Sequence, residues 1–282
     1  MNEAAPVHQH GIETRPVSIP APLPIVCMAI GDLYCLADTY ITRMFEMLTR
    51  HCPVPFRLVC YTDLPRNAPG GVEFRDCSGW NELERDGMRA TTRKLGLFNP
   101  DYVEFEEYLY LDLTLVIRQS MEALIHHAFS RPQDLIVVED WHHGGYNSSV
   151  MRIRPAPLRF IYEAFVAGES FPFRVPGDQD FIRAAVLSRG EQARVAMFPD
   201  GWVFSFKGMM RIGRRDPVRA RDLIEHATVV KFHGQPRMHE AFDPLHHFFR
   251  IRLRDWAHGR LRSPISIADL KSHWVSRLAS ER

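Results

Sequence analysis

Polar side chains follow five apolar segments of the sequence, each at the point where a strand would end. In open α/β sheets, ligands bind beyond the carboxyl ends of the strands. Aspartate and glycine are also ordinary turn residues, so one such position alone carries little information. Because the pattern recurs after five segments, we expect a polar binding site at one edge of a sheet. The residues concerned are Gly31 and Asp32, Thr62 and Asp63, Asp112, Glu139 and Asp140, and His233 and Gly234.

The segments that must position these residues begin with a strand, a helix and a second strand. Residues 25–30 form an unbroken apolar run, which suits a strand covered on both faces. Residues 33–50 carry apolar side chains on one side of a helix, and residues 56–61, Phe-Arg-Leu-Val-Cys-Tyr, predict a second strand. Short joints between strand, helix and strand indicate a parallel βαβ unit.

The same alternation continues to residue 232. It predicts an α/β fold with a mixed, mostly parallel sheet flanked by helices. The further strands are expected at 107–112, 115–117, 135–138, 149–153 and 229–232, and the further helices at 90–98, 121–129, 157–167 and 178–189.

Composition excludes several classes of function. The 282 residues are 45% hydrophobic and 24% charged, which is typical of a soluble globular protein with a substantial core. The formal net charge is +1, without the basic excess of a protein that wraps nucleic acid. The sequence contains no G-x-G-x-x-G, Walker lysine loop or G-x-S-x-G motif. Their absence argues against dinucleotide oxidoreductases, P-loop enzymes and serine hydrolases.

The cysteines and the apolar runs indicate a cytoplasmic protein. There are five cysteines and no C-x-x-C pair, so a reducing compartment is the simpler inference. The longest apolar stretch, near residues 24–30, is far shorter than the roughly 20 residues of a membrane span. The amino-terminal residues lack the basic and apolar regions of a secretory signal.

The two ends of the chain differ from the rest. Residues 1–23 are rich in proline and predict a disordered leader before a domain at 24–241. Residues 242–282 hold eight Lys or Arg residues against four acidic ones. We interpret them as a basic helical extension packed on the domain. A second interpretation is that 242–262 lie on an anionic membrane surface, peripherally at the inner membrane face.

Four short blocks resemble GT-A glycosyltransferases, in particular glycosyltransferase family 8 and related bacterial enzymes. They occur in the order found in that family, within residues 25–240. The block at 109–114, Leu-Tyr-Leu-Asp-Leu-Thr, resembles the Asp-x-Asp strand, and Tyr-Asn-Ser-Ser-Val-Met at 146–151 resembles the Asn-Ser-Gly/Ser strand. Gly-Asp-Gln-Asp-Phe-Ile at 177–182 is similar to the Asp-Gln-Asp motif, and Phe-His-Gly-Gln-Pro-Arg at 232–237 to the closing His/Gly/Lys-Pro segment.

The resemblance implies a GT-A-like (Rossmann-like) domain that transfers a sugar from a nucleotide-sugar donor, a UDP-sugar, to a hydroxyl acceptor with retention of stereochemistry. The acceptor would be a saccharide or a lipid-linked molecule. In the family pattern, Asp178 contacts the sugar hydroxyls and Gln179 lies beside the anomeric carbon. The donor- and nucleotide-binding residues carried over from the family are Gly31, Asp32, Tyr34, Thr62, Asp63, Lys94, Asp112, Asn147, Ser148, Gly234 and Arg237.

The resemblance also implies a divalent cation, Mn²⁺ or Mg²⁺, bound by Asp112 and His233. Such an ion stabilises the negative charge on the leaving phosphate. The third residue of the Asp-x-Asp block is Thr114 where the family has aspartate. Threonine is a neutral and much weaker ligand for a hard cation.

Three outcomes of the Thr114 replacement stay open. We favour an active enzyme that depends only weakly on metal. A second outcome is metal independence, in which Lys94, Lys231 or Arg237 neutralises the leaving group. The third is loss of activity, which would leave a non-catalytic sugar-nucleotide-binding protein with a degenerate Asp-x-Asp motif.

Overall fold

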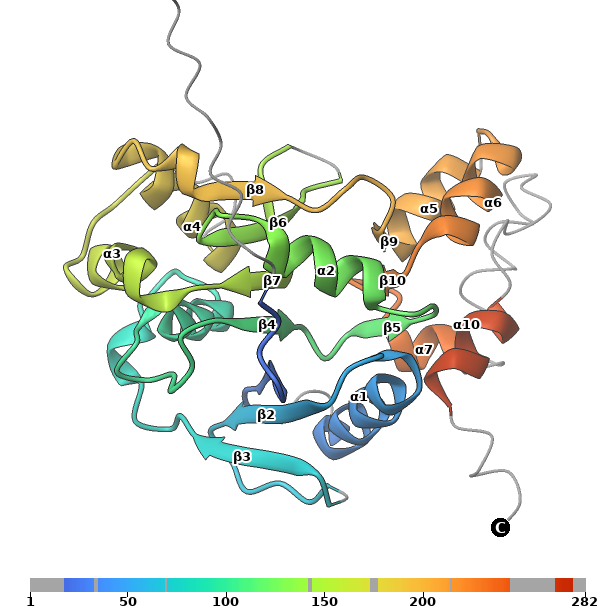
Figure 1. Ribbon diagram of the computed structural model, residues 1–282, viewed down its shortest axis with the longest axis horizontal. Coiled ribbons are helices and arrows are strands. Elements are labelled where there is room, and N and C mark those ends of the chain that lie inside the picture. The colour runs from blue at the N-terminus through green and yellow to red at the C-terminus, as the bar shows by residue number, and fades with distance from the viewer. Residues whose placement is uncertain are drawn as a thin grey trace, which may run out of the picture.

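A seven-stranded sheet forms the centre of the molecule (Figure 1). The computed structural model describes residues 18–32, 35–68, 70–141, 144–172, 177–213, 215–243 and 267–275. In spatial order, the strands of this sheet are β3 (Val72–Asp76), β2 (Phe56–Thr62), β1 (Leu23–Ala29), β4 (Tyr108–Leu111), β7 (Tyr146–Ile153), β6 (Leu135–Glu139) and β8 (Val195–Met197).

The pairing of the strands brings several polar segments to one edge of this sheet. β1 runs parallel to β2 and β4, and β2 runs parallel to β3. β7 is antiparallel to both of its neighbours, β4 and β6. The carboxyl ends of β1, β2, β4 and β6 therefore lie at the same edge as the amino end of β7. This arrangement confirms the predicted mixed, mostly parallel sheet.

A second, three-stranded sheet continues from the first. β10 (Val229–Lys231) lies between β5 (Leu115–Ile117), to which it is antiparallel, and β9 (Val203–Ser205), to which it is parallel. Its register places Lys231 opposite Leu115, and the Phe232 backbone N–H donates to the Thr114 carbonyl at 3.0 Å. Only residues 112–114 separate β4 from β5, so the two sheets meet beside Asp112.

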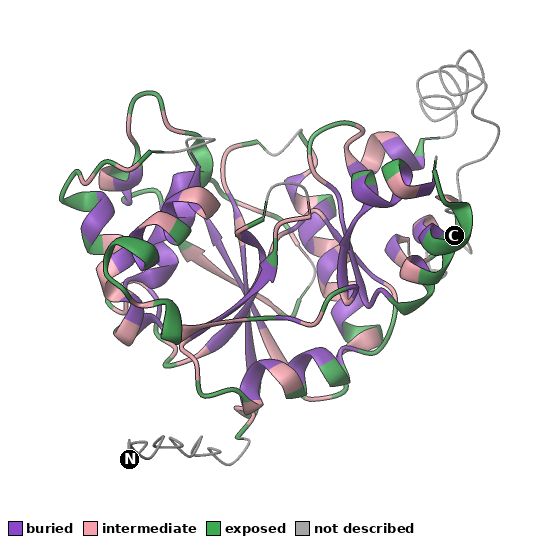
Figure 2. Cartoon of the chain, turned by 90° about the horizontal axis from the view of Figure 1, so that it is seen from above, coloured by how far each residue is buried: buried purple, intermediate pink, exposed green. Residues whose placement is uncertain are grey.

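Both faces of the large sheet are covered by apolar side chains. Along β1, Ile25 and Cys27 belong to one core cluster and Val26 to the other, as the alternation of a strand requires. Figure 2 shows buried strands between helices that expose their outer faces.

The helices divide between these two clusters. The first cluster includes side chains from α1, α2, α5, α6, α7 and α10, and the second includes side chains from η3, α3 and α4. Their bounds are α1 (Ala37–His51), η2 (Asn81–Leu83), η3 (Ala90–Phe98), α2 (Glu122–Ser130), α3 (Pro155–Val166), α4 (Asp178–Ser188), η4 (Gln192–Arg194), α5 (Phe206–Gly213), α6 (Pro217–His226), α7 (Met238–Phe242) and α10 (Ile267–Trp274), of which η2, η3 and η4 are 3₁₀ helices.

Some elements differ from the sequence-based expectation. The segment at 90–98 is a 3₁₀ helix, and β3, β8, β9, α5, α6 and α7 were not predicted. α10 packs against α1, β5 and α7. Residues 1–17, 244–266 and 276–282 lie outside the described residues, so the interpretations of the leader and of the basic segment 242–262 stay predictions. Among the described helices, none is long and apolar enough to cross a bilayer.

The position of η3 depends on close packing at Gly96. A Cβ atom there would lie 2.5 Å from Trp80 Cε3 and 2.9 Å from Leu83 Cδ1. The Trp80 ring is held in place by stacking on Tyr102, with ring centroids 4.8 Å apart. We therefore expect Gly96→Ala to lower the free energy of unfolding by about 1–3 kcal/mol.

Urea denaturation measures this change. The matched control is Gly79→Ala, because a Cβ at this exposed position meets no atom within 4 Å. Equal stability of the two variants would contradict the packing constraint on η3.

Candidate functional site

Two cavities open at the strand edge where the polar segments meet. Their volumes are about 460 and 530 Å³, within the range of small-molecule binding sites. They share part of their lining, so they form one continuous hollow. The shared residues are Arg89, Thr91, Lys94, Asp112, Lys231, His233 and Gly234.

Asp112 lies at the centre of this hollow, directly after β4. Its Oδ1 accepts hydrogen bonds from Lys94 Nζ at 3.0 Å and from the Tyr110 hydroxyl at 2.7 Å. Its Oδ2 accepts from Lys231 Nζ at 2.5 Å. Burial alone would raise the pKa of Asp112, but the charges of Lys231 and Lys94 outweigh it and hold the pKa well below its usual range. The carboxylate is therefore ionised at neutral pH.

Lys94 joins Asp112 to the start of α4. Its Nζ lies 3.1 Å from Asp178 Oδ2 and 3.2 Å from Ser148 Oγ. The Ser148 hydroxyl also donates to Asp178 Oδ2 at 2.5 Å. Burial opposes the charged form of Lys94, yet the carboxylates of Asp112 and Asp178 raise its pKa above the ordinary value. Four residues expected in the site from the sequence thus form one hydrogen-bonded cluster.

Lys231 reaches the same carboxylate from the second sheet. It is the last residue of β10, and its Nζ donates to Asp112 Oδ2 and to Thr114 Oγ1, each at 2.5 Å. Burial lowers the pKa of Lys231, and the attraction of Asp112 opposes that effect while the charge of Lys94 adds to it. The ammonium group lies between Asp112 and Thr114, the first and third residues of the block that resembles the Asp-x-Asp motif.

The residues present at this position do not fit a divalent cation bound through Asp112. Both carboxylate oxygens accept hydrogen bonds from ammonium groups, and Thr114 accepts one as well. His233, the other expected ligand, instead bonds through Nε2 to Ser205 Oγ at 2.6 Å and stacks on Trp141. Within the described ranges, no group of three or more His, Cys, Asp or Glu side chains is arranged to hold a metal ion.

The lining of the two cavities carries more positive than negative side chains. Six cationic side chains face three carboxylates, an excess that favours an anionic ligand. The cationic residues are Arg89, Lys94, Lys207, Arg211, Lys231 and Arg237, and the acidic residues are Asp112, Asp140 and Asp178.

Asn147 and Gln179 form the neutral part of the lining. The Asn147 amide nitrogen donates to Gln179 Oε1 at 3.4 Å, which links β7 to the first turn of α4. The other end of the amide is fixed, because Asn147 Oδ1 accepts from the Ser149 hydroxyl at 2.5 Å. These polar groups are of the kind that bind sugar hydroxyls.

The residues expected at the ends of β1 and β2 form a separate network. Asp63 accepts from the Gly31 backbone N–H at 2.8 Å and from Arg93 at 3.0 Å. Arg66 Nε donates to Thr62 Oγ1 at 2.9 Å. Gly31, Thr62, Asp63 and the neighbouring Asp32 do not line either cavity. Tyr34 lies outside the described residues, whereas Gly234 and Arg237 do line the hollow.

Several lining residues were not selected from the sequence. Arg89 and Thr91 lie at the start of η3, Trp141 follows β6, and Lys207 and Arg211 belong to α5. The spacing of the last pair, four residues apart on one helix, is a signal for a shared cationic face. This spacing could not be recognised from the sequence, because α5 itself was not predicted.

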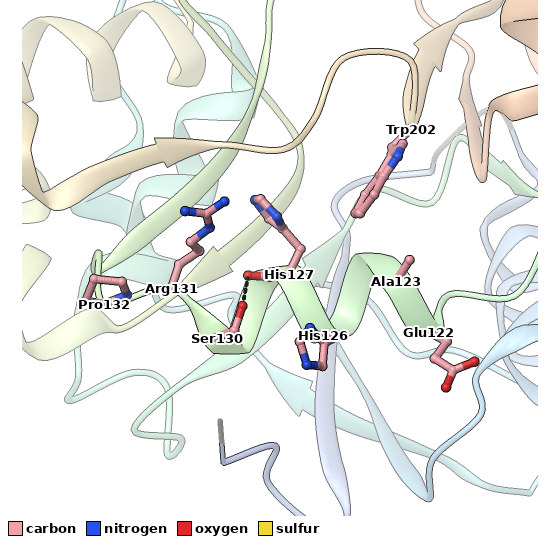
Figure 3. Close-up of a pocket in the computed structure, with 8 residues that line it drawn as sticks. All are labelled: Glu122, Ala123, His126, His127, Ser130, Arg131, Pro132 and Trp202. Carbon is pink, nitrogen blue, oxygen red and sulfur yellow. Dashed lines mark hydrogen bonds between the residues drawn. The ribbon is translucent and has the colours of Figure 1, made fainter. Parts of the chain in front are cut away.

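A further cavity lies along α2, away from this cluster (Figure 3). Its volume is about 620 Å³. His127 packs edge-on against Trp202, with ring centroids 5.7 Å apart, and Figure 3 shows the His126 ring pointing the other way. The lining contains none of the residues expected in the site.

Comparison with solved structures finds this fold in glycosyltransferases. The galactosyltransferase LgtC, solved with donor and acceptor sugar analogues, has a TM-score of 0.52 at 15% identity and matches over 85% of this chain and 96% of its own. Mouse xyloside xylosyltransferase 1 has a TM-score of 0.53 at 14% identity, over 77% of this chain and 99% of that one. The glycosyltransferase GlyE of Streptococcus pneumoniae has a TM-score of 0.51 at 14% identity, over 89% of this chain and 62% of its own.

These comparisons establish the fold. No protein-family model and no curated protein matches the sequence. The chain therefore has the GT-A glycosyltransferase fold that its sequence predicted, at an identity where similarity concerns architecture rather than substrate.

The charge cluster predicts a pH-dependent contribution to stability. The pKa of Asp112 is lower in the folded chain than in the unfolded one, so its ionisation stabilises the fold fully above about pH 4 and less as pH falls further. Asp112→Asn leaves two buried ammonium groups without this partner. We expect it to cost about 3–5 kcal/mol of unfolding free energy at neutral pH, and less than that at about pH 3.

Urea denaturation between neutral pH and about pH 3 measures the difference between wild type and variant. Asp101→Asn is the control, because Asp101 pairs with Arg159 on the surface and its loss should cost less than about 1 kcal/mol. A difference that stays constant over this pH range would contradict the account.

Proposed function

We propose that the chain is a glycosyltransferase that moves a sugar from a nucleotide-sugar donor, a UDP-sugar, to a hydroxyl group of a saccharide or lipid-linked acceptor. The observation that carries this proposal is the cation-rich hollow at the strand edge, in which ammonium groups adjoin carboxylate and amide side chains. The GT-A fold of the chain supports it.

The two kinds of side chain in the hollow match the two parts of such a donor. The diphosphate would lie among Lys94, Lys231 and Arg237, whose positive charges offset its own. The sugar hydroxyls would lie against Asp178 and Asn147. Oδ2 of Asp178 already accepts from Lys94 and Ser148, so this carboxylate is suited to binding hydroxyls rather than to attack on carbon.

The transfer step breaks one bond and forms one. The bond between the anomeric carbon and the diphosphate oxygen breaks, and its electron pair stays on that oxygen. The acceptor hydroxyl oxygen bonds to the anomeric carbon and gives its proton to an oxygen of the leaving diphosphate. Preorganised ammonium groups stabilise the charge that develops on the leaving group.

Gln179 is placed to position the reacting sugar. Its side-chain oxygen accepts from Asn147, and among the described residues no partner of its amide N–H groups is found, so these donors can face a ligand. A glutamine side chain is a weak nucleophile, so attack by the acceptor on the same face that the diphosphate leaves is consistent with retention. The donor phosphate then serves as the base.

The acceptor would enter through the part of the hollow that belongs to the cavity of about 530 Å³ and not to that of about 460 Å³. Trp141, Lys207 and Arg211 line this part together with Gln179. Trp141 is fixed by its indole N–H, which donates to the Val203 carbonyl at 3.1 Å, and by stacking on His233. A fixed aromatic face and two cations suit a saccharide that carries a phosphate, as lipid-linked acceptors do.

Nucleotide release tests the proposal. The full chain would be incubated with a panel of UDP- and GDP-sugars and simple saccharide acceptors, and free nucleotide and glycosylated product would be measured. We expect release and product with at least one UDP-sugar. Tight binding without turnover would instead support a non-catalytic sugar-nucleotide-binding protein, and neither binding nor release would contradict the proposal.

Lys94→Met gives the residue-level test. Removal of a preorganised cation at the leaving group is expected to lower kcat about 100-fold or more. Lys271→Met, on α10 and outside both cavities, is the matched control and should retain the wild-type rate. Equal rates in the two variants would remove Lys94 from the site.

A further inference from the structure

We propose that the Lys231 ammonium group is a built-in cation that takes the place of a divalent metal ion at the donor diphosphate. This inference rests on the proposed function, because it assumes that the hollow binds a diphosphate. It assigns to one residue of the chain the role that an exchangeable ion would otherwise have.

The position of Lys231 is fixed by backbone structure. The residue ends β10, whose antiparallel register with β5 places it opposite Leu115. The hydrogen bond from Phe232 N–H to the Thr114 carbonyl continues this register to the Asp-x-Thr segment. The ammonium group therefore comes to Asp112 from a strand, not from a loop.

The contacts of the ammonium group are those expected of a bound cation. Nζ lies 2.5 Å from Asp112 Oδ2 and 2.5 Å from Thr114 Oγ1, between the first and third residues of that segment. The Lys231 side chain is 9% exposed, so it is held in place before a ligand arrives.

The ammonium group retains a donor for a ligand. It has three N–H groups, and its contacts with Asp112 and Thr114 use two of them. Within the part of the chain that the structure describes, no further partner of Nζ is found, and Lys231 lines both cavities. The third N–H is available to an oxygen of the diphosphate.

Lys94 supplies a second positive charge beside Lys231. It holds the other oxygen of the same carboxylate, at 3.0 Å from Asp112 Oδ1. The two ammonium groups together carry the formal charge of one divalent ion, and they are paired with the carboxylates of Asp112 and Asp178. When the bond to the anomeric carbon breaks and its electron pair stays on the diphosphate oxygen, Lys231 and Lys94 stabilise that oxygen as a metal ion would.

Binding of inorganic pyrophosphate tests the anion-binding role without requiring turnover. Calorimetry in the presence of EDTA would compare wild type, Lys231→Met and the control Lys271→Met. We expect wild type and the control to bind pyrophosphate equally, and Lys231→Met to bind it at least about tenfold more weakly. Unchanged affinity in a folded Lys231→Met variant would overturn the proposal.

Binding of Mn²⁺ alone tests the position of the built-in cation. Electron paramagnetic resonance would count bound Mn²⁺ on wild type, Thr114→Asp and the double variant Thr114→Asp/Lys231→His. We expect no site in wild type or in Thr114→Asp, where the ammonium group still fills the position. The double variant combines two carboxylates with an imidazole and should bind one Mn²⁺.

The outcomes separate this inference from the proposed function. A Mn²⁺ site in wild type that Asp112→Asn removes would overturn the inference, and so would a folded double variant without Mn²⁺ binding. Sugar transfer by wild type that is abolished by EDTA would overturn it while leaving the proposed function intact. Pyrophosphate binding through Lys231 without transfer from any donor would support the inference and contradict the proposed function.

Discussion

The ion-pair cluster around Asp112 is the interaction on which the rest of the site depends. One carboxylate accepts hydrogen bonds from Lys94 on η3 and Lys231 on β10, and so ties three distant segments together. Buried charges are costly unless they are paired, so loss of the Asp112 carboxylate would leave Lys231 without an acidic partner and Lys94 with Asp178 alone. The same cost fixes their positions before a ligand binds, which is the condition for stabilising charge in a transition state.

The fold brings these charges together through strand direction and register. β4 ends at the sheet edge where Asp112 begins, and β7 begins at that edge with Asn147 and Ser148 because it is antiparallel to β4. The small sheet then supplies Lys231 from more than a hundred residues further along the chain. Packing at Gly96 holds η3, and with it Lys94, against the same edge. The site thus requires both sheets.

The sequence predicted the part of the site that local pattern determines. Polar residues after apolar runs and the resemblance to a known family identified Lys94, Asp112, Ser148 and Asp178, which the structure brings together. From the sequence, Lys231 was one of three candidate cations, together with Lys94 and Arg237. The sequence did not single it out, because its contact with Thr114 depends on the pairing of β10 with β5, which local sequence does not encode. β3, β8 and β9 are short, and the helical pattern of α5 was missed, so Lys207 and Arg211 were missed with it.

A crystal structure with an unreactive nucleotide-sugar analogue, grown in the presence of Mn²⁺, tests the central claim most directly. The account predicts Lys231 Nζ within hydrogen-bonding distance of a diphosphate oxygen, still in contact with Asp112 and Thr114, and no metal ion between the carboxylate and the diphosphate. A Mn²⁺ ion bound by Asp112 and the diphosphate, with the Lys231 side chain displaced, would contradict it.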